Sequence, residues 1–87
     1  MFYVYVLKSP KTEQIYVGFT EDLQRRFGEH QQLQRHKGWK LVYYEAYRNR
    51  EDAAERERKL KSYGSSLQRL KTRLRRSLDF QDLEWAG

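Results

Sequence analysis

The chain has 87 residues, a formal net charge of +6 and no cysteine, so disulfides and thiolate zinc sites are excluded. This length gives one small domain over residues 1–87, without room for a second core. Aromatic residues make up 15% of the chain, and its seven tyrosines offer large contact areas with polar tips. No apolar run approaches the length of a membrane span, and Met1 leads directly into a strand-like run instead of a signal peptide. We therefore expect a cytoplasmic protein.

The first part of the chain predicts two strands and a helix. Phe2–Lys8 is rich in β-branched and aromatic residues and is apolar on both faces, which indicates a strand covered on both sides. A turn leads to a second strand over Gln14–Phe19, most simply the hairpin partner of the first. Thr20 is the expected N-cap of a helix that runs to about Gln34. A basic loop follows, in which His36 is expected to be exposed.

The middle of the chain predicts a third strand and a second helix. Trp39–Tyr47 is again aromatic and aliphatic, and its tyrosines are expected to pack against the sheet, although an exposed one could stack on bases. Asn49 is the expected N-cap of a helix over about Arg50–Tyr63, and Gly64 is expected to end it.

The last part predicts a third helix, capped by Ser65 or Ser66 and ending near Leu78. The resulting order, β-β-α-β-α-α, predicts an α+β fold in which helices flank a small three-stranded antiparallel sheet. The core would span about residues 2–78, with a short tail over residues 79–87. The apolar stripe of the third helix is Leu67, Leu70, Leu74 and Leu78, and the tail residues that could dock are Phe80, Leu83 and Trp85.

Positive charge is concentrated in one stretch. Residues 56–76 contain nine Lys or Arg and one acid, a net charge of +8, so the rest of the chain carries −2. A field of this sign attracts polyanions, and nucleic acid above all. The alternative is an ordinary solvated helix surface. The cations expected to contact nucleic acid are Lys61, Arg69, Lys71, Arg73, Arg75 and Arg76.

Polar residues fall on the inward faces of two predicted helices. Arg26 and His30 share the apolar stripe of the first helix, and Glu57 lies on the inward face of the second. A buried carboxylate is costly unless it is paired or bound to metal. A buried Arg26–Glu57 salt bridge without chemistry is one interpretation, and exposure of one residue through a small error in the helix angle is another. A single histidine such as His30 is more often structural.

Taken together, these motifs resemble the GIY-YIG nuclease superfamily. Tyr3-Val4-Tyr5 and, eleven residues on, Tyr16-Val17-Gly18 stand for the two tripeptides that name the family. Arg26 and His30 follow, and Arg56-Glu57-Arg58-Lys59-Leu60-Lys61 is similar to the later family helix, whose glutamate binds the metal. The resemblance covers nearly the whole chain. It is closest to small bacterial single-domain members, similar to the nuclease domain of the excision-repair incision subunit.

The resemblance implies a metal-dependent endonuclease-type domain that hydrolyses phosphodiester bonds in DNA, with a structure-specific role in repair or recombination. Glu57 would hold a hydrated Mg²⁺ or Mn²⁺, and Arg26 would clamp the scissile phosphate. Tyr16 would accept a proton from the attacking water, helped by neighbouring cations. Tyr5 and His30 would position water or phosphate, with His30 as a second candidate base.

Some expectations concern the substrate and the partners. Gly18 would let the substrate backbone approach closely. Many family members carry an asparagine after the glutamate helix, whereas the single asparagine here, Asn49, precedes it, so Asp79 or Gln81 would have to serve instead. We expect weak sequence preference, a monomer or weak homodimer, and a targeting protein partner. The alternatives are a catalytically weak or inactive nucleic-acid-binding module and a basic module that binds an acidic protein.

Overall fold

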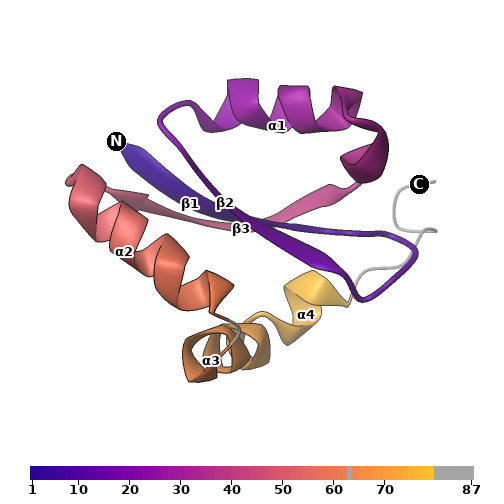
Figure 1. Ribbon diagram of the computed structural model, residues 1–87. Helices are drawn as coiled ribbons and strands as arrows, with labels where there is room; N and C mark the ends of the chain where they lie inside the picture. Colours follow the sequence, from indigo (N-terminus) through magenta and orange to yellow (C-terminus); the bar gives the residue numbers. More distant parts are fainter. Residues whose placement is uncertain (63, 80–87) are drawn as a thin grey trace.

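Three antiparallel strands form the centre of the structure, a computed structural model that describes residues 1–62 and 64–79 (Figure 1). They are β1 (Phe2–Lys8), β2 (Ile15–Thr20) and β3 (Lys40–Tyr47). Their order is β2-β1-β3, so β1 is central and both of its neighbours are edge strands. The predicted α+β fold class and the predicted hairpin are confirmed, with the strand boundaries shifted by one residue at most.

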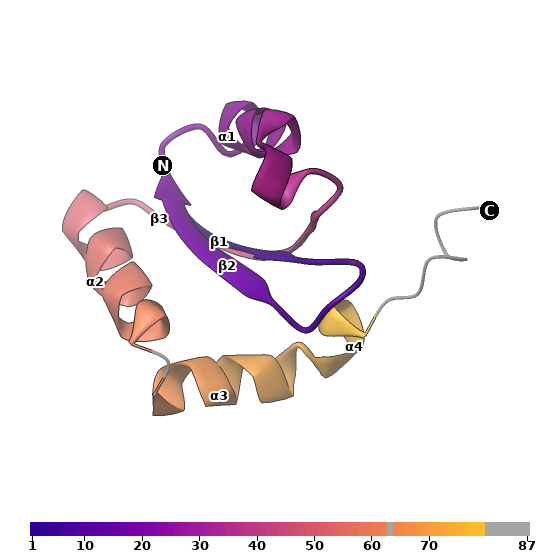
Figure 2. The same cartoon turned by 45° about the vertical axis from the view of Figure 1, so that its right-hand side comes forward.

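Helices cover both faces of the sheet. In Figure 1, α1 lies on one face, and α2 and α3 lie on the other. Figure 2 shows that α2, α3 and α4 follow one another around this second face. Both faces of β1 are therefore covered, as its two apolar faces predicted. The helices are α1 (Leu23–Gln32), the 3₁₀ helix η1 (Gln34–His36), α2 (Arg50–Lys61), α3 (Ser65–Arg73) and α4 (Arg75–Leu78).

The two faces of the sheet bury different kinds of side chain. On the face of α2 and α3, the fully buried residues are all aliphatic, and partly buried aromatic residues such as Phe2 and Phe19 pack against them. Full burial of a side chain such as Leu60 contributes about 1.5–3 kcal/mol. On the face of α1, Tyr5 and His30 are both buried. The aliphatic face therefore provides a core that holds the sheet in place under the polar one. Its buried residues are Val4, Val6, Val17, Ala53, Leu60, Leu67 and Leu70.

Helix α1 begins later and ends earlier than predicted. Thr20 is the last residue of β2 and still pairs with Tyr3, so it cannot be the N-cap, and that prediction was wrong. The N-cap is Asp22, whose carboxylate accepts a hydrogen bond from the Arg25 amide at 3.1 Å. The helix ends at Gln32, because the next residue is extended and the chain turns into η1.

Helix α2 begins as predicted. The Asn49 side chain accepts hydrogen bonds from the amides of Glu51, at 2.8 Å, and Asp52, at 3.2 Å. Both acids lie in the first turn, where the helix dipole favours negative charge. The helix ends at Lys61, and the predicted end at Tyr63 lies outside the described residues.

The predicted third helix is in fact two helices. Gly64 occupies the N-cap position of α3 and Ser65 is its first residue, so neither predicted serine is the cap. Leu74 leaves helical geometry, with φ −101° and ψ 13°, and separates α3 from α4. The predicted stripe is confirmed, because its four leucines are buried or half-buried.

The expectations for Phe80, Gln81, Leu83 and Trp85 lie outside the described residues. Within residues 1–62 and 64–79, none of the helices combines the length and the apolar character that crossing a membrane requires.

Candidate active site

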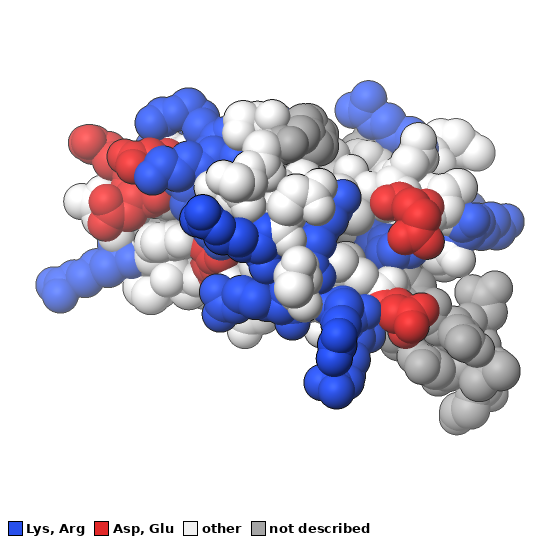
Figure 3. Space-filling view, turned by 90° about the horizontal axis from the view of Figure 1, so that it is seen from below, with Lys and Arg blue, Asp and Glu red and all other residues white. Residues whose placement is uncertain are grey.

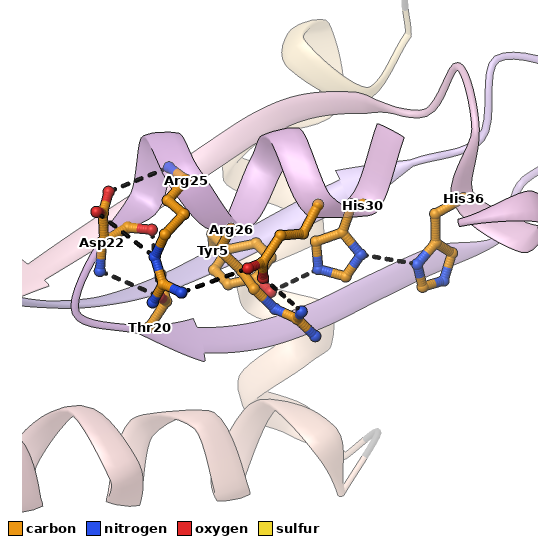
Figure 4. Close-up of polar contacts among 8 residues, drawn as sticks. Tyr5, Thr20, Asp22, Arg25, Arg26, His30 and His36 are labelled. Atoms are coloured by element: carbon orange, nitrogen blue, oxygen red, sulfur yellow. Dashed lines mark hydrogen bonds and ion pairs between the residues drawn. The ribbon is translucent and has the colours of Figure 1, made fainter. Parts of the chain in front are cut away.

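Five predicted site residues lie around the β2 edge of the sheet, and we call them the Tyr5 cluster. Four of them lie on the face of α1, and Glu57 lies on α2 (Figure 1), where its partner Lys61 reaches the Tyr16 ring. Tyr5 lies on β1, Tyr16 on β2, Arg26 and His30 on α1, and Glu57 on α2. The ring centroids of Tyr5 and Tyr16 are 6.2 Å apart, and those of Tyr16 and His30 are 5.0 Å apart. Figure 4 shows Arg26, Tyr5 and His30 following one another between α1 and the sheet.

The sheet register places both phenols on the face of α1. Tyr5 pairs with Gly18 and Leu7 pairs with Tyr16, and partners in an antiparallel ladder share a face. A Cβ atom at Gly18 would lie 2.3 Å from Cζ and Oη of Tyr5, so the tyrosine ring occupies the space that any other residue would fill. Gly18 therefore accommodates Tyr5. The substrate contact expected at Gly18 stays a prediction.

A chain of hydrogen bonds runs from Tyr5 through His30 to His36. Tyr5 Oη lies 2.7 Å from His30 Nε2, and His30 Nδ1 lies 2.9 Å from His36 Nδ1. Burial raises the pKa of Tyr5 to about 12 and lowers the pKa of His30 to about 4, with Arg26 contributing to the second shift. Both groups are therefore neutral at pH 7, and we assign the phenol O–H as the donor to Nε2 and His30 Nδ1–H as the donor to His36.

His36 was expected to be exposed, and this was wrong. Only 6% of the residue is exposed. Its ring centroid lies 4.7 Å from that of Tyr16 and 4.8 Å from that of Trp39. Burial lowers the pKa of His36, as do the nearby guanidinium groups of Arg35 and Arg26. Helical periodicity could not relate His36 to His30, because α1 ends between them.

Arg26 and Glu57 are held apart, and each has a partner near the surface. Arg26 pairs with Glu29 at 3.0 Å, and these side chains are 36% and 43% exposed. Glu57 pairs with Lys61 at 3.1 Å, and these side chains are 22% and 45% exposed. No ion pair joins Arg26 to Glu57 among the described residues, so the interpretation as a buried salt bridge was wrong. Such partly exposed pairs contribute about 0–1 kcal/mol each, and a ligand can displace them easily.

Positive charge surrounds the two phenols. The pKa of Arg26 is raised by its hydrogen bond to Glu29 and, to a smaller extent, by the phenols of Tyr5 and Tyr16. The Lys61 ammonium lies 5.5 Å from the centroid of the Tyr16 ring. An anionic ligand that displaced Glu29 would therefore meet at least two cations.

The donors fit a hard divalent cation better than a zinc ion. Among residues 1–62 and 64–79, no group of three or more His, Cys, Asp or Glu is arranged to hold a metal. Glu57 alone could hold Mg²⁺ or Mn²⁺, because Mg²⁺ keeps several waters and needs only one or two carboxylates together with substrate phosphates. The carboxylate already neighbours a cation, Lys61, that a metal could replace.

A second polar cluster, which the sequence did not indicate, joins β3 to α2. Arg56 donates from Nε to Oε1 of Glu45 at 2.9 Å and from Nη2 to Oε2 at 2.8 Å, and the two side chains are 25% and 14% exposed. The phenols of Tyr43, at 2.7 Å, and Tyr47 also donate to Glu45. Burial alone would raise the pKa of Glu45, but the hydrogen bonds from Arg56, Tyr47 and Tyr43 outweigh it and lower the pKa. We call these four residues the Glu45 cluster.

The cations expected to bind nucleic acid lie mainly on α3 and α4. Figure 3 views the molecule from below, and Lys and Arg gather across this face. Lys61 instead lies at the Tyr5 cluster, and Lys71 is half-buried. The exposed members on α3 and α4 are Arg69, Arg73, Arg75 and Arg76.

Comparison with known proteins identifies the family of the chain. The model of the GIY-YIG family, described as the GIY-YIG catalytic domain, matches residues 1–71. The matched residues include every member of the Tyr5 cluster. Neither the curated proteins nor the solved structures gave a match.

Proposed function

Because the chain belongs to the GIY-YIG family of nuclease-type catalytic domains, we propose that it is a metal-dependent endonuclease that hydrolyses phosphodiester bonds in DNA. The observation that carries the proposal is the Tyr5 cluster, where a guanidinium, a carboxylate and two phenols lie together with partners that a substrate can displace. A bacterial, cytoplasmic role in repair or recombination stays a prediction.

Arg26 would bind the scissile phosphate. Its planar guanidinium matches two phosphate oxygens, and it would exchange the Glu29 carboxylate for the phosphodiester, which carries the same single negative charge before the reaction. The phenols of Tyr5 and Tyr16 beside it limit the positions that the phosphate can take. This contact would also stabilise the negative charge that grows on the phosphate in the transition state.

Tyr16 would hold the attacking water and accept its proton, directly or through a hydrogen bond. The nearby charges of Arg26 and Lys61 would stabilise the negative charge that develops on its oxygen. Tyr5 has a different part, because its raised pKa, about 12, keeps the phenol protonated as a donor. His30 is only 1% exposed and accepts from Tyr5, so it would act by positioning Tyr5 and not by touching water.

Glu57 would hold the Mg²⁺ or Mn²⁺ ion, which when bound supplies positive charge at the phosphate and at the leaving oxygen. The Lys61 partner of Glu57 would then be released to contact a neighbouring phosphate. The described residues after α2 contain no asparagine that could match the family asparagine, and Asp79, the residue expected to take its place, is exposed. A binding module without catalysis is the second candidate function, favoured by the basic face of α3 and α4.

The test is a cleavage screen over single-stranded, duplex and branched DNA with Mg²⁺ or Mn²⁺. The wild type would be compared with Glu57→Gln and with the matched control Glu55→Gln, an exposed glutamate on the same helix that pairs with Lys59. We expect Glu57→Gln to lose at least about 100-fold in rate and Glu55→Gln to change less than about threefold. Equal cleavage by all three would indicate a contaminating nuclease, and binding without cleavage would favour the binding module.

A further inference from the structure

A groove beside the Tyr5 cluster has no part in the mechanism above. Its volume is about 490 Å³, within the range of small-ligand sites, and it is bounded by the hairpin turn before β2, by η1 and by α3. Arg35, His36, Trp39 and Lys71 line it, together with one acid, Glu13. The groove thus combines aromatic surface with an excess of positive charge.

The groove is linked to the Tyr5 cluster through one shared residue. The His36 ring contacts Tyr16 on one side and Trp39 on the other, with ring centroids 4.7 Å and 4.8 Å away. Trp39 is therefore two ring contacts from the phenol that would activate water. A group bound against Trp39 would lie within a nucleotide or two of the scissile phosphate.

The backbone around Trp39 is fixed before any ligand arrives. The Gln31 side chain donates to the Trp39 carbonyl at 2.9 Å and accepts from the Gly38 amide at 3.1 Å. Gly38 has φ +82°, a conformation that other residues rarely adopt, and Trp39, which lines the groove, directly follows it. A fixed aromatic platform binds with less loss of conformational entropy than a mobile one.

We propose that this groove binds an unpaired nucleotide next to the cleavage site, with its base stacked on Trp39 and its phosphate on Arg35 and Lys71. The inference rests on the proposed function and specifies its substrate class. Stacking on an indole requires an exposed base face, which a continuous duplex does not offer, and it tolerates all bases. The two cations complement phosphate, and Glu13 opposes only part of their charge. The preferred substrates are then single-stranded, flapped or branched.

Tryptophan fluorescence tests this directly without any cleavage. Trp85→Phe leaves Trp39 as the only tryptophan, and Glu57→Gln prevents turnover. In this background we would titrate an oligothymidylate of eight nucleotides and a blunt duplex of the same length, without metal. We expect the single strand to quench the fluorescence and the duplex to change it little.

Affinity measurements on the same background complete the test. Trp39→Ala should weaken single-strand binding about tenfold, as loss of one stacked base predicts, and duplex binding less than twofold. Trp39→Phe should keep most of the affinity, and circular dichroism would verify that both variants fold. Absence of quenching, or equal losses for single strand and duplex, would overturn the proposal. Failure of cleavage by the wild type would instead count against the nuclease function and leave this result unaffected.

Discussion

The Tyr5 cluster and the Glu45 cluster contain the same charged and phenolic residues, one arginine, one glutamate and two tyrosines, in opposite arrangements. In the Glu45 cluster the arginine and the glutamate bind each other through two nearly parallel hydrogen bonds, and both phenols donate to the same carboxylate. In the Tyr5 cluster the two charges stay apart, and each pairs with a residue near the surface. The Glu45 cluster is a structural joint, meaning that it ties α2 to β3, whereas the Tyr5 cluster leaves its charges available to a ligand.

The origin of the difference is the layer from which each residue comes. Glu45 on β3 and Arg56 on α2 meet on one face of the sheet, whereas Arg26 on α1 and Glu57 on α2 come from opposite faces. Arg56 and Glu57 are neighbours in the sequence, but about 100° of helical rotation directs them to different clusters. The Glu45–Arg56 joint therefore fixes the rotation of α2 and, with it, the direction of Glu57.

The largest expected effect is on catalysis. Arg26→Ala should lower the cleavage rate about 10²- to 10³-fold, because the phosphate loses the guanidinium that stabilises its charge. Arg25→Ala is the matched control, since Arg25 pairs with the same Glu29 but is 65% exposed, and it should change the rate less than about threefold. Single-turnover cleavage measures both. Similar losses in the two variants would mean that Arg26 contributes only general positive charge.

The next effect is on stability. Arg56→Gln should lower the free energy of unfolding by about 2–3 kcal/mol, because the largely buried Glu45 carboxylate loses its counter-charge. Lys59→Gln breaks only the exposed pair with Glu55, so it should cost about 0.5 kcal/mol or less. Urea denaturation of both variants provides the comparison. A cost for Arg56→Gln as small as that for Lys59→Gln would show that the Glu45 cluster is not a structural joint.

The smallest effect appears in the pH dependence of stability. Below pH 6.5 the unfolded chain protonates His30, whereas the folded chain keeps it neutral down to a pKa of about 4, so the free energy of unfolding falls as the pH falls between these values. From pH 7 to pH 5 the wild type should lose about 1–2 kcal/mol more than His30→Gln, which lacks the titrating group. Denaturation at the two pH values measures this difference. An identical loss in both proteins would contradict the buried neutral histidine.

The sequence predicted the fold well because hydrophobic patterns, turns and one good cap determine it locally. Strands over Phe2–Lys8 and near Ile15–Thr20 follow from their aromatic and β-branched residues, and Asn49 follows from capping chemistry. The error at the start of α1 arose because two neighbouring residues satisfy the same capping rule. Thr20 and Asp22 are both good caps, and only the strand pairing of Thr20 decides between them.

For the site, helical periodicity predicted that Arg26, His30 and Glu57 point inward, and the resemblance to a family assigned their chemistry. Only His30 is fully buried, whereas Arg26 and Glu57 are half-buried. Periodicity could not identify His36, which reaches the site through a 3₁₀ turn. Nor could it identify the Glu45 cluster, because Glu45 on β3 and Arg56 on α2 meet only when the helix packs on the sheet. The sequence therefore shows which residues are unusual, but not which charges neutralise each other.

The most direct test compares the two clusters: one carboxylate is removed from each, and both unfolding and cleavage are measured for each variant. We predict that Glu57→Gln changes the free energy of unfolding by less than about 1 kcal/mol and lowers the cleavage rate of a branched DNA at least about 100-fold. Glu45→Gln should lose about 2–3 kcal/mol of stability while its folded fraction still cleaves. A Glu57→Gln protein that cleaves at the wild-type rate, or that loses as much stability as Glu45→Gln, would contradict the account.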